Sequence, residues 1–342
     1  RSIRAKGKAY MFRFVLRRSA WAIPTLLLVT FLVYIALRMG TDPLASYMRS
    51  NPRATRSKIA QYKELNGLGS NYVTGYFSWL QNFVTFNWPN SIKGSREVWP
   101  ELKDAIANSA RLGIAATTVG VSIGLTIGIF AALRPGGKRD VAVNTAAFVG
   151  ISIPPYISAI LLQLLFAVYW SKWFGNTLFP TSGVYPPGQD GFDLVLMLKH
   201  MALPTFVVAI QVIAVYSRYM RSSLLDVLNS DYMRTARSKG ISERRVLIKH
   251  GMRNALIPVV TIAALDVGSI VGGLIITENI FSYPGMGLYF LKSFGEGDFP
   301  LLMPWMVVIV ASVLFFSTTR ISGNEQVVGN DQVGILAARV KL

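Results

Sequence analysis

Few residues of this chain have side chains that could carry out a reaction. Cysteine is absent from the 342 residues, and histidine occurs only as His200 and His250. A cysteine nucleophile, a thiolate zinc site and a histidine-rich metal site are therefore all disfavoured. The segment Gly136-Gly137-Lys138 lacks the first glycine and the hydroxyl of a phosphate-binding loop, and no His-Glu-x-x-His or Gly-x-Ser-x-Gly motif occurs. We therefore predict that the chain is not an enzyme and binds no metal or cofactor itself.

A second set of polar residues lies within long apolar runs, where a polar group that faces lipid is costly. Its members are Asn144, Gln163, Gln211 and Asp266. Each amide can line a path across a membrane or form a hydrogen bond between helices. Asp266 is a lone carboxylate, so we predict a functional role for it, either with a cationic group of a solute or with a second subunit.

Two further candidates for the path lie at interruptions of the apolar pattern. Pro154, followed by Pro155, breaks an apolar run and frees backbone carbonyls, which predicts either a bend beside the path or a packing kink. Glu278 precedes the turn Pro284-Gly285-Met286-Gly287 at the outer end of a predicted span. This region either meets an arriving solute or serves only to make the turn.

These candidates must be positioned by membrane helices. The chain is 52% hydrophobic and 15% charged, whereas a soluble domain averages about 25% charged residues. We predict an all-α polytopic membrane protein with six transmembrane helices. The spans are 20–37, 112–133, 141–169, 201–217, 256–277 and 300–316. In the fifth span, Leu, Ile and Val contribute roughly −4 to −7 kcal/mol of insertion free energy against about +3 for Asp266, so the segment can insert.

The distribution of Lys and Arg predicts the orientation. Seven precede the first span, three lie in 134–140, nine in 218–255 and three after the sixth span. Segments 170–200 and 278–299 hold only two and one, and segment 38–111 is long enough to cross regardless of charge. Both termini are therefore predicted to be cytoplasmic. Because the net charge of +18 then suits topology and anionic lipid, a nucleic-acid partner is not needed to explain it.

The spans predict the organisation of the whole chain. A basic cytoplasmic N-terminus, 1–19, precedes the first span, 38–111 is extracytoplasmic, and 112–316 forms the core. The polar remainder, 317–342, is predicted to be a cytoplasmic tail without fixed structure. Within the outer segment, aromatic residues at helical spacing either lie in the membrane interface or pack on neighbouring spans. They are Tyr72, Tyr76, Trp79 and Phe83.

The loop after the fourth span, 229–245, has the pattern of a helix, a turn and a second helix. Ser230 or Asp231 can cap the first helix, and Gly240 can adopt the left-handed conformation that ends it. The apolar positions of this helix are Tyr232, Met233 and Ala236. Ser242 can cap the second helix, which leads into the fifth span. A short two-faced helix beside the membrane can dock on a cytoplasmic partner or rest on lipid, and the pattern alone leaves both open.

Several motifs along the chain agree with one another. The loop has Arg234-Thr235-Ala236, three residues and Gly240, followed by His250-Gly251-Met252-Arg253-Asn254-Ala255-Leu256-Ile257-Pro258. Elsewhere the chain has Ile153-Pro154-Pro155-Tyr156 and Glu278-Asn279-Ile280-Phe281-Ser282-Tyr283-Pro284-Gly285-Met286-Gly287. Together these motifs resemble the permease subunits of bacterial ABC importers for dipeptides, oligopeptides and related solutes. The resemblance extends from the basic start near Arg13 to Asp298-Phe299-Pro300, and only the segment after Phe316 departs from it.

The resemblance implies the permease fold of type I ABC importers, alternating access and a bacterial inner-membrane location. Two permease subunits, expected to be different homologous chains, would enclose the path. Two cytoplasmic ATPases that use ATP and Mg would drive it, and an extracytoplasmic substrate-binding protein would deliver the solute. ATPase coupling is implied for Asp231, Tyr232, Arg234, Thr235, Ala236, Lys239, Gly240 and Ile241. For Arg234 and Lys239, contact with anionic lipid is an equal alternative.

The solute and the energy source are separate questions. Peptide is the expected solute, and nickel complexes, glutathione and oligosaccharides are alternatives that the resemblance leaves open. The main rival function is an ion-coupled secondary transporter or a channel. That function needs ionisable relays within the membrane, and apart from Asp266 the predicted spans lack them. A membrane-embedded enzyme is a third class, which no motif supports.

Overall fold

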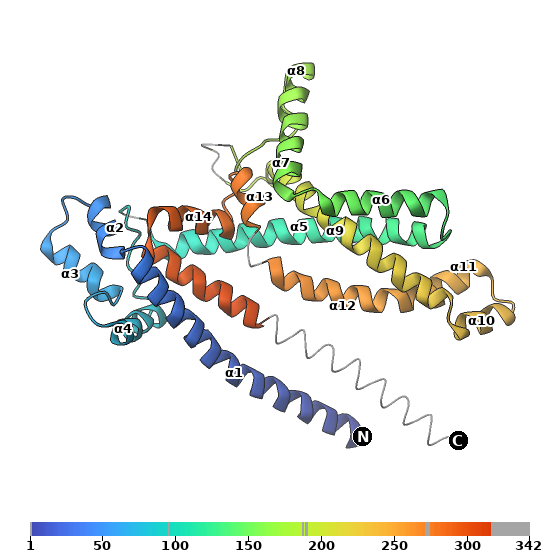
Figure 1. The fold of residues 1–342 in the computed structure, drawn as a ribbon, viewed down its shortest axis with the longest axis horizontal. Helices are drawn as coiled ribbons and strands as arrows, with labels where there is room; N and C mark the ends of the chain where they lie inside the picture. Colours follow the sequence, from blue (N-terminus) through green and yellow to red (C-terminus); the bar gives the residue numbers. More distant parts are fainter. Residues whose placement is uncertain (1, 95, 187, 189–190, 271–273, 316–342) are drawn as a thin grey trace. The chain divides into compact units, whose positions relative to one another are not determined.

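The computed structural model describes residues 2–94, 96–186, 188, 191–270 and 274–315, except for the side chains of residues 2–19, 261 and 264–270. Every regular element in these ranges is a helix (Figure 1), which confirms the predicted all-α class. The chain divides into two compact units, Arg1–Ile106 with Tyr289–Leu342, and Ala107–Leu288. Helices α5 (Val98–Ala132) and α14 (Met286–Glu296) run across the division. The predicted tail 317–342 lies outside the described residues.

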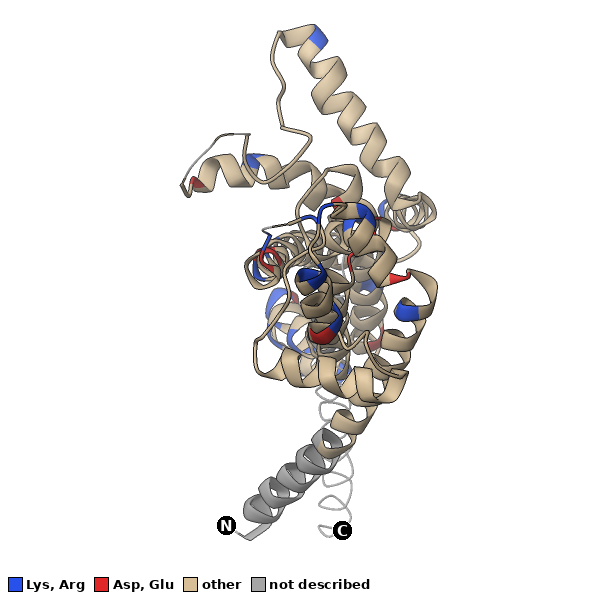
Figure 2. Ribbon diagram, turned by 90° about the vertical axis from the view of Figure 1, so that its left-hand side faces the viewer, with Lys and Arg blue, Asp and Glu red and all other residues tan. Residues whose placement is uncertain are grey.

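Four helices in the described ranges are long and apolar enough to cross a membrane. They are Ala20–Gly40 within α1 (Ser2–Gly40), α5, Pro155–Phe174 and α9 (Leu194–Leu228). A further apolar helix, Phe299–Phe315, is shorter. The helix Pro155–Phe174 carries no charge except Lys172 near its end, as Figure 2 shows. The predicted fifth span begins within α12 (Arg253–Ile270), residues 271–273 are not described, and α13 (Ile275–Ile280) follows.

The prediction of one continuous span at 141–169 is wrong. Helix α6 (Lys138–Ser152) ends before Ile153, whose backbone is extended at φ −79° and ψ 117°. A residue that precedes proline is driven out of the helical region by the proline ring. Helix α7 (Pro155–Gln163) then begins and continues through η1 (Leu164–Tyr169) and α8 (Trp170–Phe174). Figure 1 shows this second rod turning sharply away from α6.

In the first unit, segment 38–111, which is predicted to be extracytoplasmic, begins with short capped helices. Asp42 accepts a hydrogen bond from the backbone of α2 (Pro43–Ser50), Thr55 from that of α3 (Arg56–Leu65), and Asn71 from that of α4 (Tyr72–Val84). Each cap satisfies an amide that has no partner inside its helix, and this fixes where the helix starts.

The predicted aromatic stripe in α4 packs inward for the most part. Tyr76 and Trp79 are buried with Tyr34 of α1 and Phe299, and the Tyr76 hydroxyl lies 2.8 Å from the Thr30 hydroxyl. Phe83 stacks on Trp79. Packing on a neighbouring span is therefore the correct alternative for these positions. Tyr72 differs, since it is half exposed and lies beneath the Arg38 guanidinium, 4.9 Å away.

In the second unit, α9 is the central helix and α5 packs against it closely. Gly120, Gly124 and Gly128 form one stripe of α5, and an added Cβ would lie 2.6 Å from Val212 Cβ, 3.0 Å from Tyr216 Cβ and 2.5 Å from Ser217 O respectively. Such small residues let two membrane helices approach until their backbones touch. On α9, Tyr216, Met220 and Leu224 are buried in one apolar cluster with Ala255 and Val259 of α12.

Candidate functional site

The loop after α9 folds as a short helix tied to its neighbours by three buried side chains. Helix α10 (Asp231–Ser238) buries Met233 and Ala236 against Val246 of η2 (Val246–Met252). Val227 and Leu228, at the end of α9, and Ile241 complete this small core. The helix is therefore packed against the end of α9 and the start of the next helical segment, so a displacement of α10 acts on both.

Gly240 ends α10 in the conformation that the sequence predicts. Its φ is +71°, and its amide donates to Arg237 O at 2.9 Å. Nothing lies within 4 Å of the position a Cβ would occupy. The requirement for glycine at this position is therefore a requirement for the left-handed backbone, which costs other L-residues about 1–2 kcal/mol, and not a requirement for space.

Three details of the loop differ from the prediction. Tyr232 is half exposed and accepts a hydrogen bond from Asn254 Nδ2 at 3.1 Å, so it does not belong to the apolar face. Ser230 is the N-cap residue, but its hydroxyl donates to Val227 O and makes no capping bond. Ser242 also makes no side-chain capping bond to α11 (Glu243–Arg245). The Ser230 hydroxyl bonds to a carbonyl and Ser242 is exposed to solvent, so neither hydroxyl needs a helix amide as its partner.

Four of the remaining predicted coupling positions have exposed side chains. Asp231, Arg234, Thr235 and Lys239 are exposed, and the Arg234 guanidinium lies 3.8 Å from the Asp231 carboxylate. Ala236 and Ile241 belong to the buried side. The loop thus has one face that fixes it to the chain and one polar face that is available to a partner.

An ion pair that sequence reasoning missed spans the turn. Arg237 donates through Nε and Nη2 to the Glu243 carboxylate, at distances from 2.9 to 3.3 Å. This hydrogen bonding lowers the pKa of Glu243. Two opposite charges on either side of Gly240-Ile241-Ser242 were the available signal. Since the two groups belong to α10 and α11, the pair links the two helices across the turn.

The predicted path residue Gln211 has a structural partner at the break before α7. Its Nε2 donates to Gly150 O at 2.9 Å and to Ile153 O at 3.1 Å. These carbonyls lose their helical partners because α6 stops before Pro154. The bend at Pro154 and the Gln211 amide are therefore linked by hydrogen bonds between helices, and a role of Gln211 in the path stays a prediction.

Two other predicted amides also bond within the chain. Gln163 Nε2 lies 3.3 Å from both Thr181 O and Ile280 O. Asn144 Nδ2 donates to the Asp140 carboxylate at 2.8 Å. Asp266 lies in α12, but its side chain is outside those that the structure describes, so its role stays a prediction.

Asp140 is the centre of a buried ion pair that the sequence did not reveal. Its carboxylate accepts hydrogen bonds from Arg221 Nε and Nη2, from Gly136 N and from Asn144 Nδ2. The hydrogen bonds from Arg221 are the largest cause that lowers the pKa of Asp140 to about 2. This cluster ties the turn before α6 to the last third of α9, the helix that leads to α10.

Glu278 is fully buried and organises the turn Pro284-Gly285-Met286-Gly287. It accepts hydrogen bonds from Ser109 Oγ at 2.5 Å, Gly287 N at 2.6 Å and Leu288 N at 3.2 Å. The last two amides belong to the first turn of α14, where a carboxylate is favoured. Burial raises the pKa of Glu278. Turn formation is therefore the role supported for Glu278, and Ser109 is its unpredicted partner.

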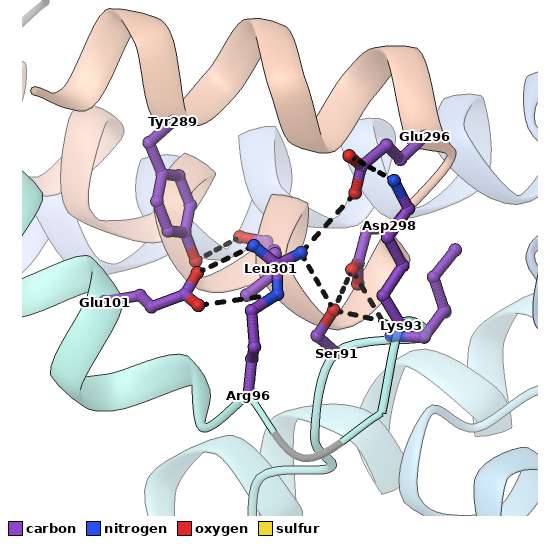
Figure 3. Close-up of polar contacts among 9 residues, drawn as sticks. Ser91, Lys93, Arg96, Glu101, Tyr289, Glu296, Asp298 and Leu301 are labelled. Atoms are coloured by element: carbon purple, nitrogen blue, oxygen red, sulfur yellow. Dashed lines mark hydrogen bonds and ion pairs between the residues drawn. The ribbon is translucent and has the colours of Figure 1, made fainter. Parts of the chain in front are cut away.

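In the first unit, Asp298 holds a second buried cluster, shown in Figure 3. Its Oδ2 accepts from Ser91 Oγ at 2.5 Å and Ile92 N at 3.3 Å, while its buried Oδ1 has no hydrogen-bond partner within 3.5 Å among the described residues. Around it, Glu296 pairs with Lys93 at 2.6 Å and with Arg96 at 3.5 Å. Burial raises the pKa of Asp298 to about 6. The cluster fastens the loop before α5 to the segment that follows α14.

The long apolar helices indicate a polytopic membrane protein. The family profile of the binding-protein-dependent transport system inner membrane component matches residues 124–323, and the chain belongs to this family. The predicted resemblance and the predicted polytopic membrane class are thereby confirmed. Because the family is a component of a transport system, the assignment is also consistent with the prediction that the chain is not an enzyme.

Named relatives are similar over most of the chain. The oligopeptide transport system permease protein AppB of Bacillus subtilis is 35% identical over 306 residues, covering 89% of this chain and 94% of AppB. The dipeptide transport system permease protein DppB of the same organism is 34% identical over 310 residues, with the same coverage of both chains. A solved structure of the MetNI methionine ABC transporter covers 65% of this chain and 94% of its own at 16% identity, with a TM-score of 0.48.

Proposed function

We propose that this chain is the translocation subunit of an ABC importer for peptides and that α10 couples it to a cytoplasmic ATPase. The names of the relatives, which give oligopeptide and dipeptide transport, support the solute. The two-sided build of α10 supports the coupling: Met233 and Ala236 are buried while Arg234 and Thr235 are exposed. This exposed face, held rigidly on the end of α9, is the observation on which the proposal depends.

The proposal includes the topology and the partners. Both termini and α10 lie in the cytoplasm, and segment 38–111 lies outside, as the nine basic residues in 218–255 favour. A second permease chain completes the path, two ATPases supply the ATP and Mg chemistry, and a binding protein delivers the peptide. The chain itself forms half of the path and contributes no nucleotide site.

The absence of cysteine from the chain allows a direct test of the coupling face. Thr235→Cys introduces one thiol on the exposed side of α10, and Gly175→Cys introduces one at the end of α8 as a control. The Thr235 thiol should react only with reagents that reach the cytoplasm and should cross-link to a nucleotide-hydrolysing subunit. Labelling of this thiol from the outer side, or cross-links to no ATPase, would remove the assignment.

Replacement of the turn glycine tests the same proposal through transport. Gly240→Val should abolish peptide uptake and leave membrane insertion intact, because the strain falls on the turn that aims α10. Gly175→Val is the matched control, since Gly175 also ends a helix with φ +77° and has nothing within 4 Å of its Cβ position. The control should keep uptake near the wild-type level. Normal uptake by Gly240→Val would contradict the coupling role.

A further inference from the structure

A cavity of about 550 Å³ lies between α6 and α9, beside the ion pair of Asp140 and Arg221. Asn144, one of the predicted path residues, lines it, and no other role proposed above uses it. Its wall has a polar end, formed by Arg218, Arg221 and Ser222 with their neighbours, and an apolar end. The two ends differ in chemistry in a way that specifies what the cavity can hold.

The polar end presents hydrogen-bond donors for which the described residues supply no partner. Arg218 stacks its guanidinium over the Phe148 ring at 4.5 Å, which leaves its N–H groups free, and no carboxylate in the described residues pairs with it. Arg221 uses Nε and Nη2 for Asp140 and keeps Nη1. The hydroxyls of Tyr219 and Ser222 complete the set. Asp140 already balances Arg221, and no carboxylate among the described side chains balances the positive charge of Arg218, so the donors suit an anion.

The apolar end follows the same two helices away from the basic turn. Phe148 and Ile151 lie one and two turns further along α6 than Asn144, and Val215 lies one turn before Arg218 on α9. Phe148 and Ile151 are exposed, with 55% and 39% of their surfaces accessible. The cavity therefore changes from charged to apolar along the direction of the helices. A small soluble anion would leave the apolar end unused.

We propose that this cavity binds one phospholipid with an anionic headgroup. The phosphate lies against Arg218, Arg221 Nη1 and Ser222, and an acyl chain lies along Phe148, Ile151 and Val215. A basic pocket between membrane helices, with an apolar continuation into the bilayer, has the chemistry that recognises such a lipid. Since Arg221 also holds Asp140, bound lipid would stabilise the connection between α6 and the helix that leads to α10.

The test uses the full chain purified with its accompanying subunits and placed in bilayer discs of equal parts dioleoylphosphatidylglycerol and dioleoylphosphatidylcholine. Native mass spectrometry then counts the lipids that stay bound after release from the disc. The wild type should retain phosphatidylglycerol selectively. Arg218→Gln should weaken this retention about tenfold, as expected for one lost charge-assisted contact. Ile151→Trp, which fills the apolar end and leaves every donor in place, should weaken it to a similar extent.

Arg139→Gln is the matched control, because Arg139 is exposed on the adjacent turn and does not line the cavity. It should retain phosphatidylglycerol like the wild type. An equal loss in Arg139→Gln would reduce the effect to general surface charge and overturn the site. Full retention by both Arg218→Gln and Ile151→Trp would overturn it as well. Displacement of the lipid by millimolar inorganic phosphate or by trialanine would show a site for a free anion or for a peptide carboxylate, and would also refute the proposal.

Discussion

The buried carboxylate of Asp298 should make the loop around Ser91 sensitive to pH. Its pKa is raised by burial from 3.8 to about 6. We call the loop closed when Ser91 and Ile92 bond to Asp298, and open when these bonds are broken. Two pKa units correspond to about 3 kcal/mol of preference for the protonated form in the closed state, at 1.36 kcal/mol per unit. The closed state binds the proton more tightly than the open state. The free energy of opening is therefore greatest below pH 4, falls as the pH rises from about 4 to 6, and is constant above that.

Hydrogen exchange at the Ile92 amide measures this opening directly, because that amide donates to Asp298 Oδ2. After correction for the intrinsic exchange rate, the wild type should be protected about fiftyfold more at pH 4 than at pH 7. In Asp298→Asn the side chain cannot ionise, so the step should disappear. Glu296→Gln is the control, since Glu296 pairs with Lys93 and Arg96 at a partly exposed position and should leave the step in place. A step that persists in Asp298→Asn, or is absent from the wild type, would refute the reasoning.

Three further predictions concern the second unit. Glu243→Arg alone should reduce the transport-coupled ATPase rate. The exchange of the two charges, Arg237→Glu with Glu243→Arg, should restore part of this rate, because the turn requires an ion pair but not a particular order of its two charges. Asp140→Asn should lower the free energy of unfolding by about 2 to 3 kcal/mol, measured by thermal denaturation in detergent, because Arg221 is left without its charge partner at a largely buried position. Unchanged stability would mean that water replaces the carboxylate. Gly128→Leu should prevent α5 from packing on α9, so that no folded chain is obtained. Gly40→Leu is the control and should fold normally, because nothing lies within 4 Å of its Cβ position. Equal yields of the two folded variants would contradict the packing argument.

The class and the loop were accessible to sequence reasoning because their signals are local. Long uncharged apolar runs predict membrane helices. A glycine just after a short helix predicts the left-handed conformation that ends it, as Gly240 does after α10. The proline pair at Pro154 predicted a bend or a kink within one span, whereas the structure has two separate helices. That choice depends on whether a distant group satisfies the freed carbonyls, and Gln211 does so from 58 residues away.

The roles of individual polar residues were harder to predict. The outward orientation of Tyr232 and the inward one of Met233 differ by one helical step, and only the position of Val246 decides which of them is buried. The sequence places the acidic residues Asp140, Glu278 and Asp298 in loops or turns between predicted spans. Each of them is nevertheless buried and accepts hydrogen bonds from specific donors.

The sequence by itself thus determined that this chain is a bundle of membrane helices with a short two-faced helix after α9. Helix length, apolar content and the backbone preferences of glycine and proline are properties of neighbouring residues, so they can be read along the chain. Only the tertiary structure decided which carboxylates are buried and which arginines remain free, because the partners Arg221, Ser109 and Ser91 lie 81, 169 and 207 residues from Asp140, Glu278 and Asp298. Electrostatic and hydrogen-bond energies depend on these distances in space, which the order of residues does not contain.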